Sequence, residues 1–204
     1  MGLRELKADR TRLTIADAAL RLFEEQGYEA TTMEQIAEAA IVSPSTLYRY
    51  FPTKDSTLIG HPAMTAGGLA RALDARPRGE AIDEALGQAL DAYFGEVDAN
   101  AELLFRLRRQ IDLVPAARAR VWDFTYQEQV LIERSIAERT SASTDDLWVQ
   151  FTAHTCLTVG QLALNMMRSA TKPDTARSFG AIVIAALQDP RIVIPRLPKQ
   201  YSAT

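Results

Sequence analysis

The chain has 204 residues, 47% of them hydrophobic and 24% charged, with a formal net charge of −3 at neutral pH. This composition is typical of a soluble globular protein of one or two domains that can bury a hydrophobic core. Because no run of about 18 apolar residues occurs, we expect no membrane span, and the charged N-terminus predicts no secretory signal. The single cysteine, Cys156, has no intramolecular partner, which favours a reducing, cytoplasmic location.

The charge of the N-terminal part gives no support for nucleic-acid binding by itself. Residues 1–60 hold seven Lys/Arg and nine Asp/Glu, whereas nucleic-acid-binding domains are usually basic. The basic residues are unevenly placed, however, and four of them gather at the start of the chain: Arg4, Lys7, Arg10 and Arg12. Since one local face can bind phosphate while the remaining surface is acidic, the charge leaves the question open.

The hydrophobic pattern is helical from end to end, with no strand alternation and no internal repeat, and it predicts an all-α fold of about nine helices. The first helix is expected over about residues 8–26, ending at Gly27, the residue type that most easily adopts a left-handed conformation. A second, short helix begins after Thr31 or Thr32. Thr32 and Gln35 have the spacing of a capping box.

The third helix has a strong start signal in Ser43 and Pro44, a capping hydroxyl followed by a proline at the first helical position. It is expected over residues 45–50 and ends at Phe51, because a residue before proline is pushed away from helical geometry. Two short helices joined by about four residues indicate a helix-turn-helix. In that motif the second helix enters the major groove of DNA while the first crosses the backbone.

Thr53 is expected to cap a fourth helix beginning at Lys54, and Pro62 to kink or break it. The segment from residue 189 to the end contains three prolines and is expected to be extended or mobile. Between these segments lie longer helices, separated by breaks that contain proline, glycine or short polar residues. They are expected at residues 63–75, 79–98, 101–113, 115–140, 144–170 and 173–188.

The third helix and its flanks carry the candidate DNA-binding residues. Short hydroxyl side chains permit a close approach to DNA, and tyrosine and arginine side chains can donate to base edges or phosphates. A lysine at the start of the next helix would add an ammonium group next to free backbone N–H groups. The candidates are Ser43, Ser45, Thr46, Tyr48, Arg49, Tyr50 and Lys54. Ser43 could serve only as a cap, Tyr50 could pack inside, and Arg49 could be a solvated helix end.

Three stretches, Ala18–Tyr28, Ala30–Ala37 and Val42–Lys54, resemble in order and spacing the DNA-binding signature of the tetracycline-repressor (TetR) family. The resemblance implies three domains or segments: a helix-turn-helix domain at 1–55, a helical effector-binding and dimerisation domain at 56–188, and a tail at 189–204. It also implies DNA-facing positions at Thr46, Tyr48, Arg49, Tyr50 and Lys54, and a phosphate contact at Thr31 or Thr32.

Two positions in the helix-turn-helix depart from the family pattern. Ile41 stands where the family usually has glycine in the turn, and Ser45 replaces another residue that is usually glycine. A β-branched side chain resists positive φ, so we expect a turn that is either strained or differently shaped.

The C-terminal two-thirds offers candidate effector-binding residues. His154, Thr158, Gln161 and Asn165 are spaced to form one polar stripe on an otherwise apolar helix. The stripe could line an effector cavity, cross a dimer interface or face water. Arg108 could bind an acidic group of an effector or be salt-bridged within the protein. The remaining candidates are aromatic residues of the kind that line cavities in helical bundles: Phe105, Trp122, Tyr126 and Phe151.

The last helix, expected at 173–188, is apolar on nearly all sides after Phe179 and must therefore be buried on several sides. The resemblance implies that it and the preceding long helix pair with a second subunit, which gives a homodimer. The predicted function is a DNA-binding transcription regulator, acting as a repressor that a small, largely apolar effector releases from a near-palindromic double-stranded operator.

Two other classes of function remain as alternatives, a helical adaptor whose helix-turn-helix no longer binds DNA and an all-α enzyme. Catalytic residues are not evident, because His154 and Cys156 are two apart on a helix and point to different sides. The sequence also lacks metal-ligand spacings, nucleotide-binding glycine loops and nucleophile elbows, so we expect no metal and no cofactor.

Overall fold

The computed structural model describes residues 2–61, 67–169 and 174–192, and within these ranges every regular element is an α-helix. This confirms the all-α prediction. None of the helices in the described ranges has the length and hydropathy that a membrane span requires. The helices are α1 (Leu3–Gln26), α2 (Met33–Ala39), α3 (Pro44–Tyr50), α4 (Ser56–Ile59), α5 (Gly68–Asp74), α6 (Ile82–Ala99), α7 (Ala101–Leu113), α8 (Pro115–Thr140), α9 (Leu147–Ser169) and α10 (Ala176–Ala186).

The predicted caps of α2 and α3 are present. The Thr32 hydroxyl accepts from the backbone N–H of Gln35 at 3.2 Å, while the Gln35 side chain accepts from the N–H of Thr32 at 2.9 Å. Ser43 caps α3 by accepting from the N–H of Thr46 at 3.2 Å. Gly27 ends α1 with a φ of 88°. These signals are local in sequence, which is why the sequence predicts them well.

The predicted start of the fourth helix is wrong. α4 begins at Ser56 rather than Lys54, with Asp55 at its N-cap. The Ser56 hydroxyl accepts from the N–H of Thr53 at 3.3 Å and donates to the carbonyl of the same residue, which closes a turn ahead of the helix. Pro62 and the first residues of the expected helix 63–75 lie outside the described residues, as do residue 173 and most of the segment 189–204.

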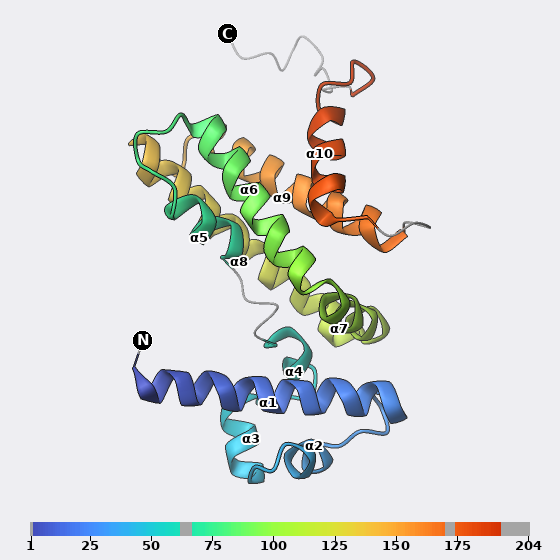
Figure 1. The fold of residues 1–204 in the computed structure, drawn as a ribbon. Helices are drawn as coiled ribbons and strands as arrows, with labels where there is room; N and C mark the ends of the chain where they lie inside the picture. The colour runs from blue at the N-terminus through green and yellow to red at the C-terminus, as the bar shows by residue number, and fades with distance from the viewer. Residues whose placement is uncertain (1, 62–66, 170–173, 193–204) are drawn as a thin grey trace, which may run out of the picture.

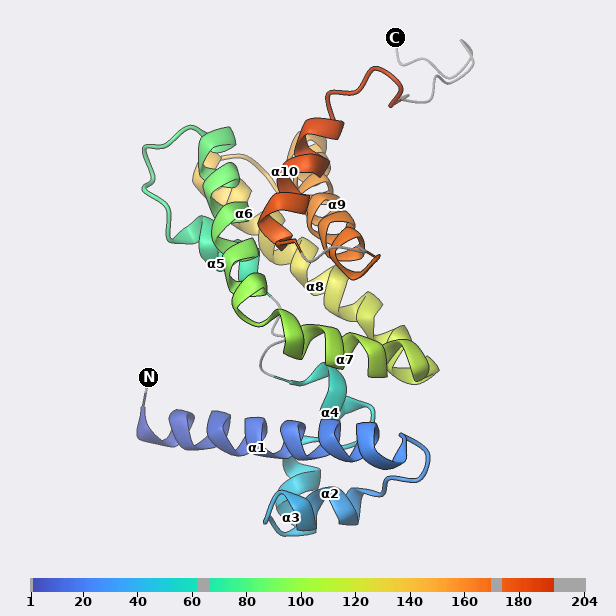
Figure 2. The ribbon, with the colours of Figure 1, turned by 45° about the vertical axis from the view of Figure 1, so that its right-hand side comes forward.

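The helices form two parts. In the N-terminal part, α2 and α3 lie on one side of α1, and α4 lies on the other side, next to α7 (Figures 1 and 2). α5, α6, α8, α9 and α10 make up the larger helical part, and α10 lies at its end far from α2 and α3 (Figure 2). α3 is thereby left at an outer edge of the molecule.

The two hydrophobic cores do not divide the chain at one sequence position. The core of α1–α4 also contains four buried residues from the corner between α7 and α8: Leu107, Ile111, Val114 and Ala117. Burial of one large aliphatic side chain contributes roughly 1.5–3 kcal/mol, so this corner is firmly attached to the N-terminal helices. The domain boundary at residue 55 stays a prediction, and the first core extends past it to Leu58 and to the corner between α7 and α8.

The expectation that the last helix is buried on several sides is wrong for the single chain. Phe179 and Val183 of α10 are buried, but Ile182, Ile184 and Leu187 are 41–50% exposed. One apolar face of α10 therefore packs in the core of its own chain, and no residue in the described ranges covers the other apolar face.

Candidate nucleic-acid interface and effector region

The turn between α2 and α3 keeps the left-handed shape that favours glycine, although isoleucine occupies it. Ile41 has a φ of 56°, and its N–H donates to the carbonyl of Glu38 at 3.0 Å. The N–H of the next residue, Val42, donates to the carbonyl of Ala37 at 2.9 Å, so both of these N–H groups in the turn are hydrogen-bonded. Because the Ile41 side chain is 92% exposed, packing does not compensate for the strain, and the strained alternative predicted from the sequence is the one present.

α3 presents a polar face to solvent. Leu47 is fully buried and anchors the helix, while Ser45, Tyr48 and Arg49 are exposed. The Tyr48 hydroxyl donates a long hydrogen bond of 3.4 Å to Glu34 on α2. A seven-residue helix of this kind is anchored by one apolar residue and displays its hydroxyl and guanidinium groups outward, which is the arrangement needed for insertion into a major groove.

Tyr50, at the end of α3, brings two basic residues together. The guanidinium carbon of Arg49 lies 5.2 Å from the centre of the Tyr50 ring, and that of Arg12 on α1 lies 5.9 Å from it. Such cation–π contacts are worth about 0.5–1 kcal/mol at exposed sites. The sequence shows Arg12 within a basic cluster but does not show that α1 carries it to the end of α3.

Two of the predicted DNA contacts point into the protein instead. Thr31 is only 1% exposed, and its hydroxyl donates to the carbonyl of Gly27 at 2.8 Å. Lys54 donates from Nζ to the carbonyls of Tyr28 at 2.6 Å and Thr31 at 2.9 Å. Both residues therefore stabilise the connection between α1 and α2. Of the two threonines, Thr32 is the exposed one.

The structure does not bring the predicted effector-binding residues together. The stripe of His154, Thr158, Gln161 and Asn165 lies on one exposed face of α9. Phe105 is half-buried against the second core, whereas three aromatic side chains are 65–77% exposed, those of Trp122, Tyr126 and Phe151.

Arg108 forms an ion pair within the chain. Its Nε lies 3.0 Å from Asp112, whose second carboxylate oxygen lies 3.0 Å from Arg168 on α9. This geometry fits the alternative in which Arg108 is salt-bridged within the protein and does not bind an effector. An acidic effector would have to compete with Asp112 for the guanidinium group.

An open apolar groove of about 360 Å³ lies where α6, α9 and α10 meet. Phe151 is the one predicted effector residue among its walls. Burial raises the pKa of the Cys156 thiol, which also lines the groove, to about 11. The sequence gives no signal for this groove, because its walls come from three separate helices. The other lining residues are Asp83, Leu86, Gly87, Leu90, Thr152, Thr155, Val159, Ile184 and Leu187. Among the described residues, no cluster of three or more His, Cys, Asp or Glu side chains could hold a metal ion.

The helix-turn-helix region matches the family described as bacterial regulatory proteins, tetR family, over residues 15–58. The HTH-type transcriptional regulator TcmR of Streptomyces glaucescens is 34% identical over 151 residues, which are 71% of this chain and 67% of that protein. The chain belongs to the TetR family. Its relatives are named as transcriptional regulators and repressors, and this TetR-family protein is accordingly a DNA-binding transcription regulator.

Solved structures show the same fold. The TetR-family repressor FadR of Thermus thermophilus, determined in complex with lauroyl-CoA, has a TM-score of 0.54 at 19% identity, with 91% of this chain and 97% of that chain covered. NalD of Pseudomonas aeruginosa, the secondary repressor of a multidrug efflux pump, has a TM-score of 0.57 at 17% identity, with 87% and 94% covered.

Proposed function

We propose that this TetR-family protein is a homodimeric repressor that binds a near-palindromic operator and is released from it by a small, largely apolar effector. The observation that carries the proposal is the exposed polar face of α3, held at the edge of the molecule by a capped, hydrogen-bonded helix-turn-helix. We assign base-edge contacts to Ser45, Thr46, Tyr48 and Arg49, because these side chains lie on the recognition helix and can donate or accept in the major groove.

Phosphate contacts fall to residues around the recognition helix. We assign them to Thr32, Ser43 and Tyr50, together with Arg12, which the Tyr50 ring holds beside α3. Phosphate contacts fix the position of a protein on the duplex without reading its sequence. Thr31 and Lys54 support binding indirectly, by holding the connection between α1 and α2 in shape.

The proposed dimer interface is the outer face of α9 and α10. Leu147 and Phe151 continue the stripe of His154, Thr158, Gln161 and Asn165 at helical spacing, so α9 has one long exposed face with an apolar end. The exposed apolar side chains of α10, led by Ile182, extend this surface. We therefore place the polar stripe in the dimer interface, one of the alternatives that the sequence left open, and not in an effector cavity.

The groove between α6, α9 and α10 is the proposed effector site. Its walls are mainly apolar, with Asp83 as the charged member, which supports an uncharged or largely apolar effector. Because α9 and α10 contribute to both the groove and the proposed interface, an occupant of the groove can change how two subunits meet.

The test is a selection of random DNA duplexes by the purified protein, followed by titration of the enriched duplex at several salt concentrations. We expect a near-palindromic site, whose binding is strongly weakened by Tyr48→Ala and Arg49→Ala and unchanged by Arg134→Ala, a surface substitution on α8. Release by compounds of increasing acyl-chain length would then test the effector class. Uniformly weak retention without enrichment would contradict the proposal and favour the adaptor alternative.

A further inference from the structure

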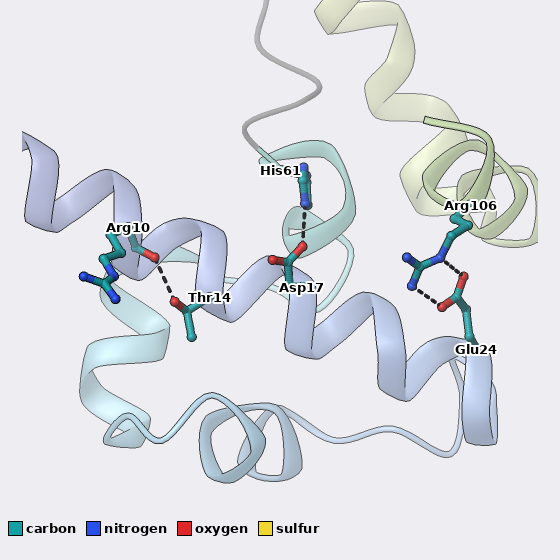
Figure 3. Close-up of polar contacts among 6 residues, drawn as sticks. All are labelled: Arg10, Thr14, Asp17, Glu24, His61 and Arg106. Carbon is teal, nitrogen blue, oxygen red and sulfur yellow. Dashed lines mark hydrogen bonds and ion pairs between the residues drawn. The ribbon is translucent and has the colours of Figure 1, made fainter. Parts of the chain in front are cut away.

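Two ion pairs join the helix-turn-helix part to the corner between α7 and α8. Arg106 on α7 contacts Glu24 at the end of α1 through both edges of its guanidinium group, with Nε–Oε1 2.9 Å and Nη2–Oε2 2.6 Å (Figure 3). Arg120 on α8 lies 2.5 Å from Asp55, the N-cap residue of α4. The two acidic partners therefore flank the helix-turn-helix in the sequence, with Glu24 before it and Asp55 after it.

The hydrogen bonds from Arg106 hold the pKa of Glu24 below its ordinary value, so this pair is charged at neutral pH. A bidentate arginine–carboxylate pair fixes orientation as well as distance. The apolar contacts of Leu107 and Ile111 beneath it are non-directional and would tolerate some rotation.

Two points of attachment define an orientation that one point does not. With Glu24–Arg106 alone, the helix-turn-helix part could turn about that contact, and Asp55–Arg120 provides a second contact on a different helix. A further hydrogen bond keeps the fourth helix against the first. Asp17 on α1 lies 3.0 Å from Nε2 of His61, a residue that is 1% exposed and directly follows α4 (Figure 3). α1 and α4 are therefore joined to each other, and each of them is also paired with one of the two arginines.

We propose that Arg106 and Arg120 are positioning residues that set the orientation of the recognition helix relative to the C-terminal part, and thereby the half-site spacing that the dimer accepts. The inference rests on the operator binding and dimerisation proposed above. Neither arginine touches DNA in this scheme. Their loss should alter spacing preference more than affinity for a single half-site.

The first experiment measures orientation without DNA. Spin labels are placed on exposed positions of α3 and α6 by Ser45→Cys and Gln88→Cys in a Cys156→Ala background, with labelled chains diluted into unlabelled ones. We expect a narrow distance distribution in the parent, a broad one in Arg106→Glu and in Arg120→Gln, and a narrow one again in the double variant Glu24→Arg with Arg106→Glu. The control Arg134→Glu removes the pair with Glu138 within α8 and should leave the distribution narrow.

The second experiment compares duplexes whose half-sites are moved one or two base pairs closer or farther apart. We expect the preference for the best spacing to fall roughly three- to five-fold for each pair lost, the size of an exposed ion pair, and to return in the charge-swapped double variant. Unchanged distance distributions in Arg106→Glu and Arg120→Gln would overturn the inference, whatever the DNA results. Failure of the parent protein to enrich any duplex would instead contradict the proposed function, and the label distances would still decide the role of the arginines.

Discussion

The ammonium group of Lys54 donates a hydrogen bond to the carbonyl of Tyr28 at 2.6 Å and lies 4.1 Å from the centre of that residue's ring. A second hydrogen bond to the carbonyl of Thr31 leaves the ammonium with little capacity for an outside partner. Lys54 thus closes the loop between α1 and α2 from a position that follows α3.

Lys54→Met should therefore lower stability. Hydrogen bonds to charged groups contribute about 1.5–3 kcal/mol, and we expect a loss of this size in urea unfolding. The dependence of operator affinity on salt should keep its slope. By contrast Arg12→Ala, the comparison variant at a proposed phosphate contact, should reduce the slope by about one phosphate contact and lower stability by no more than the ~0.5–1 kcal/mol of an exposed cation–π contact. A reduced salt slope at full stability for Lys54→Met would mean that its ammonium contacts DNA, as the sequence resemblance implies.

Ile41→Gly should stabilise the protein. A non-glycine residue in the left-handed region costs about 1–3 kcal/mol, and the 92% exposed side chain loses almost no burial when it is removed. After the entropy that glycine adds to the unfolded chain, about 0.5–1 kcal/mol, we expect a net gain of about 1 kcal/mol in chemical unfolding.

The control for this prediction is Gly27→Ala. Gly27 has a φ of 88° and open space where a Cβ would stand, so only backbone conformation is affected. This variant should be destabilised by about 1 kcal/mol or more. If Ile41→Gly is also destabilised, the isoleucine makes a contribution that its geometry does not explain.

The parts of this molecule that the sequence predicts are those in which partners lie within one helical turn. Thr32 with Gln35 and Ser43 with Thr46 are three residues apart, and their caps follow from residue type and spacing. Lys54 and Tyr28 are 26 residues apart, and Glu24 and Arg106 are 82 apart. No periodicity links such residues, so their contacts appear only when the helices are packed.

The effector region shows a second limit. Helical spacing places His154, Thr158, Gln161 and Asn165 on one face, and that face exists. Periodicity does not say what covers a face, because a cavity, a second subunit and water each permit polar residues there. The groove shows the converse case. Its lining residues lie together in space, but they come from three helices and follow no common sequence pattern.

Leu162→Glu should weaken dimerisation. Leu162 is 45% exposed and lies beside the polar stripe of α9 in the proposed interface, where a carboxylate would be desolvated against apolar partner residues. We expect a shift from dimer to monomer in sedimentation velocity, with loss of operator binding. Leu113→Glu places the same change on the last residue of α7, which is 69% exposed and outside the interface, and should leave the dimer intact. A dimeric Leu162→Glu variant would argue for a different interface.

Glu128→Gln should change how stability depends on pH. Glu128 on α8 is 7% exposed and accepts a hydrogen bond from the N–H of Gly67 at the start of α5. Burial raises its pKa above the ordinary value, opposed by the backbone hydrogen bond from Gly68 and the positive charge of Arg71. A carboxyl group whose pKa is raised on folding contributes stability that is fully present below its unfolded pKa and is lost as pH rises through its folded pKa.

The glutamine variant keeps the carbonyl acceptor for Gly67 but cannot ionise. Relative to the parent, its free energy of unfolding should therefore rise as pH increases from about 4.3 and level off once Glu128 is ionised in the folded parent. Urea unfolding between pH 4 and 8, at one fixed protein concentration, measures this difference. A curve for Glu128→Gln that runs parallel to that of the parent would show that the Glu128 carboxylate is solvated in the folded protein.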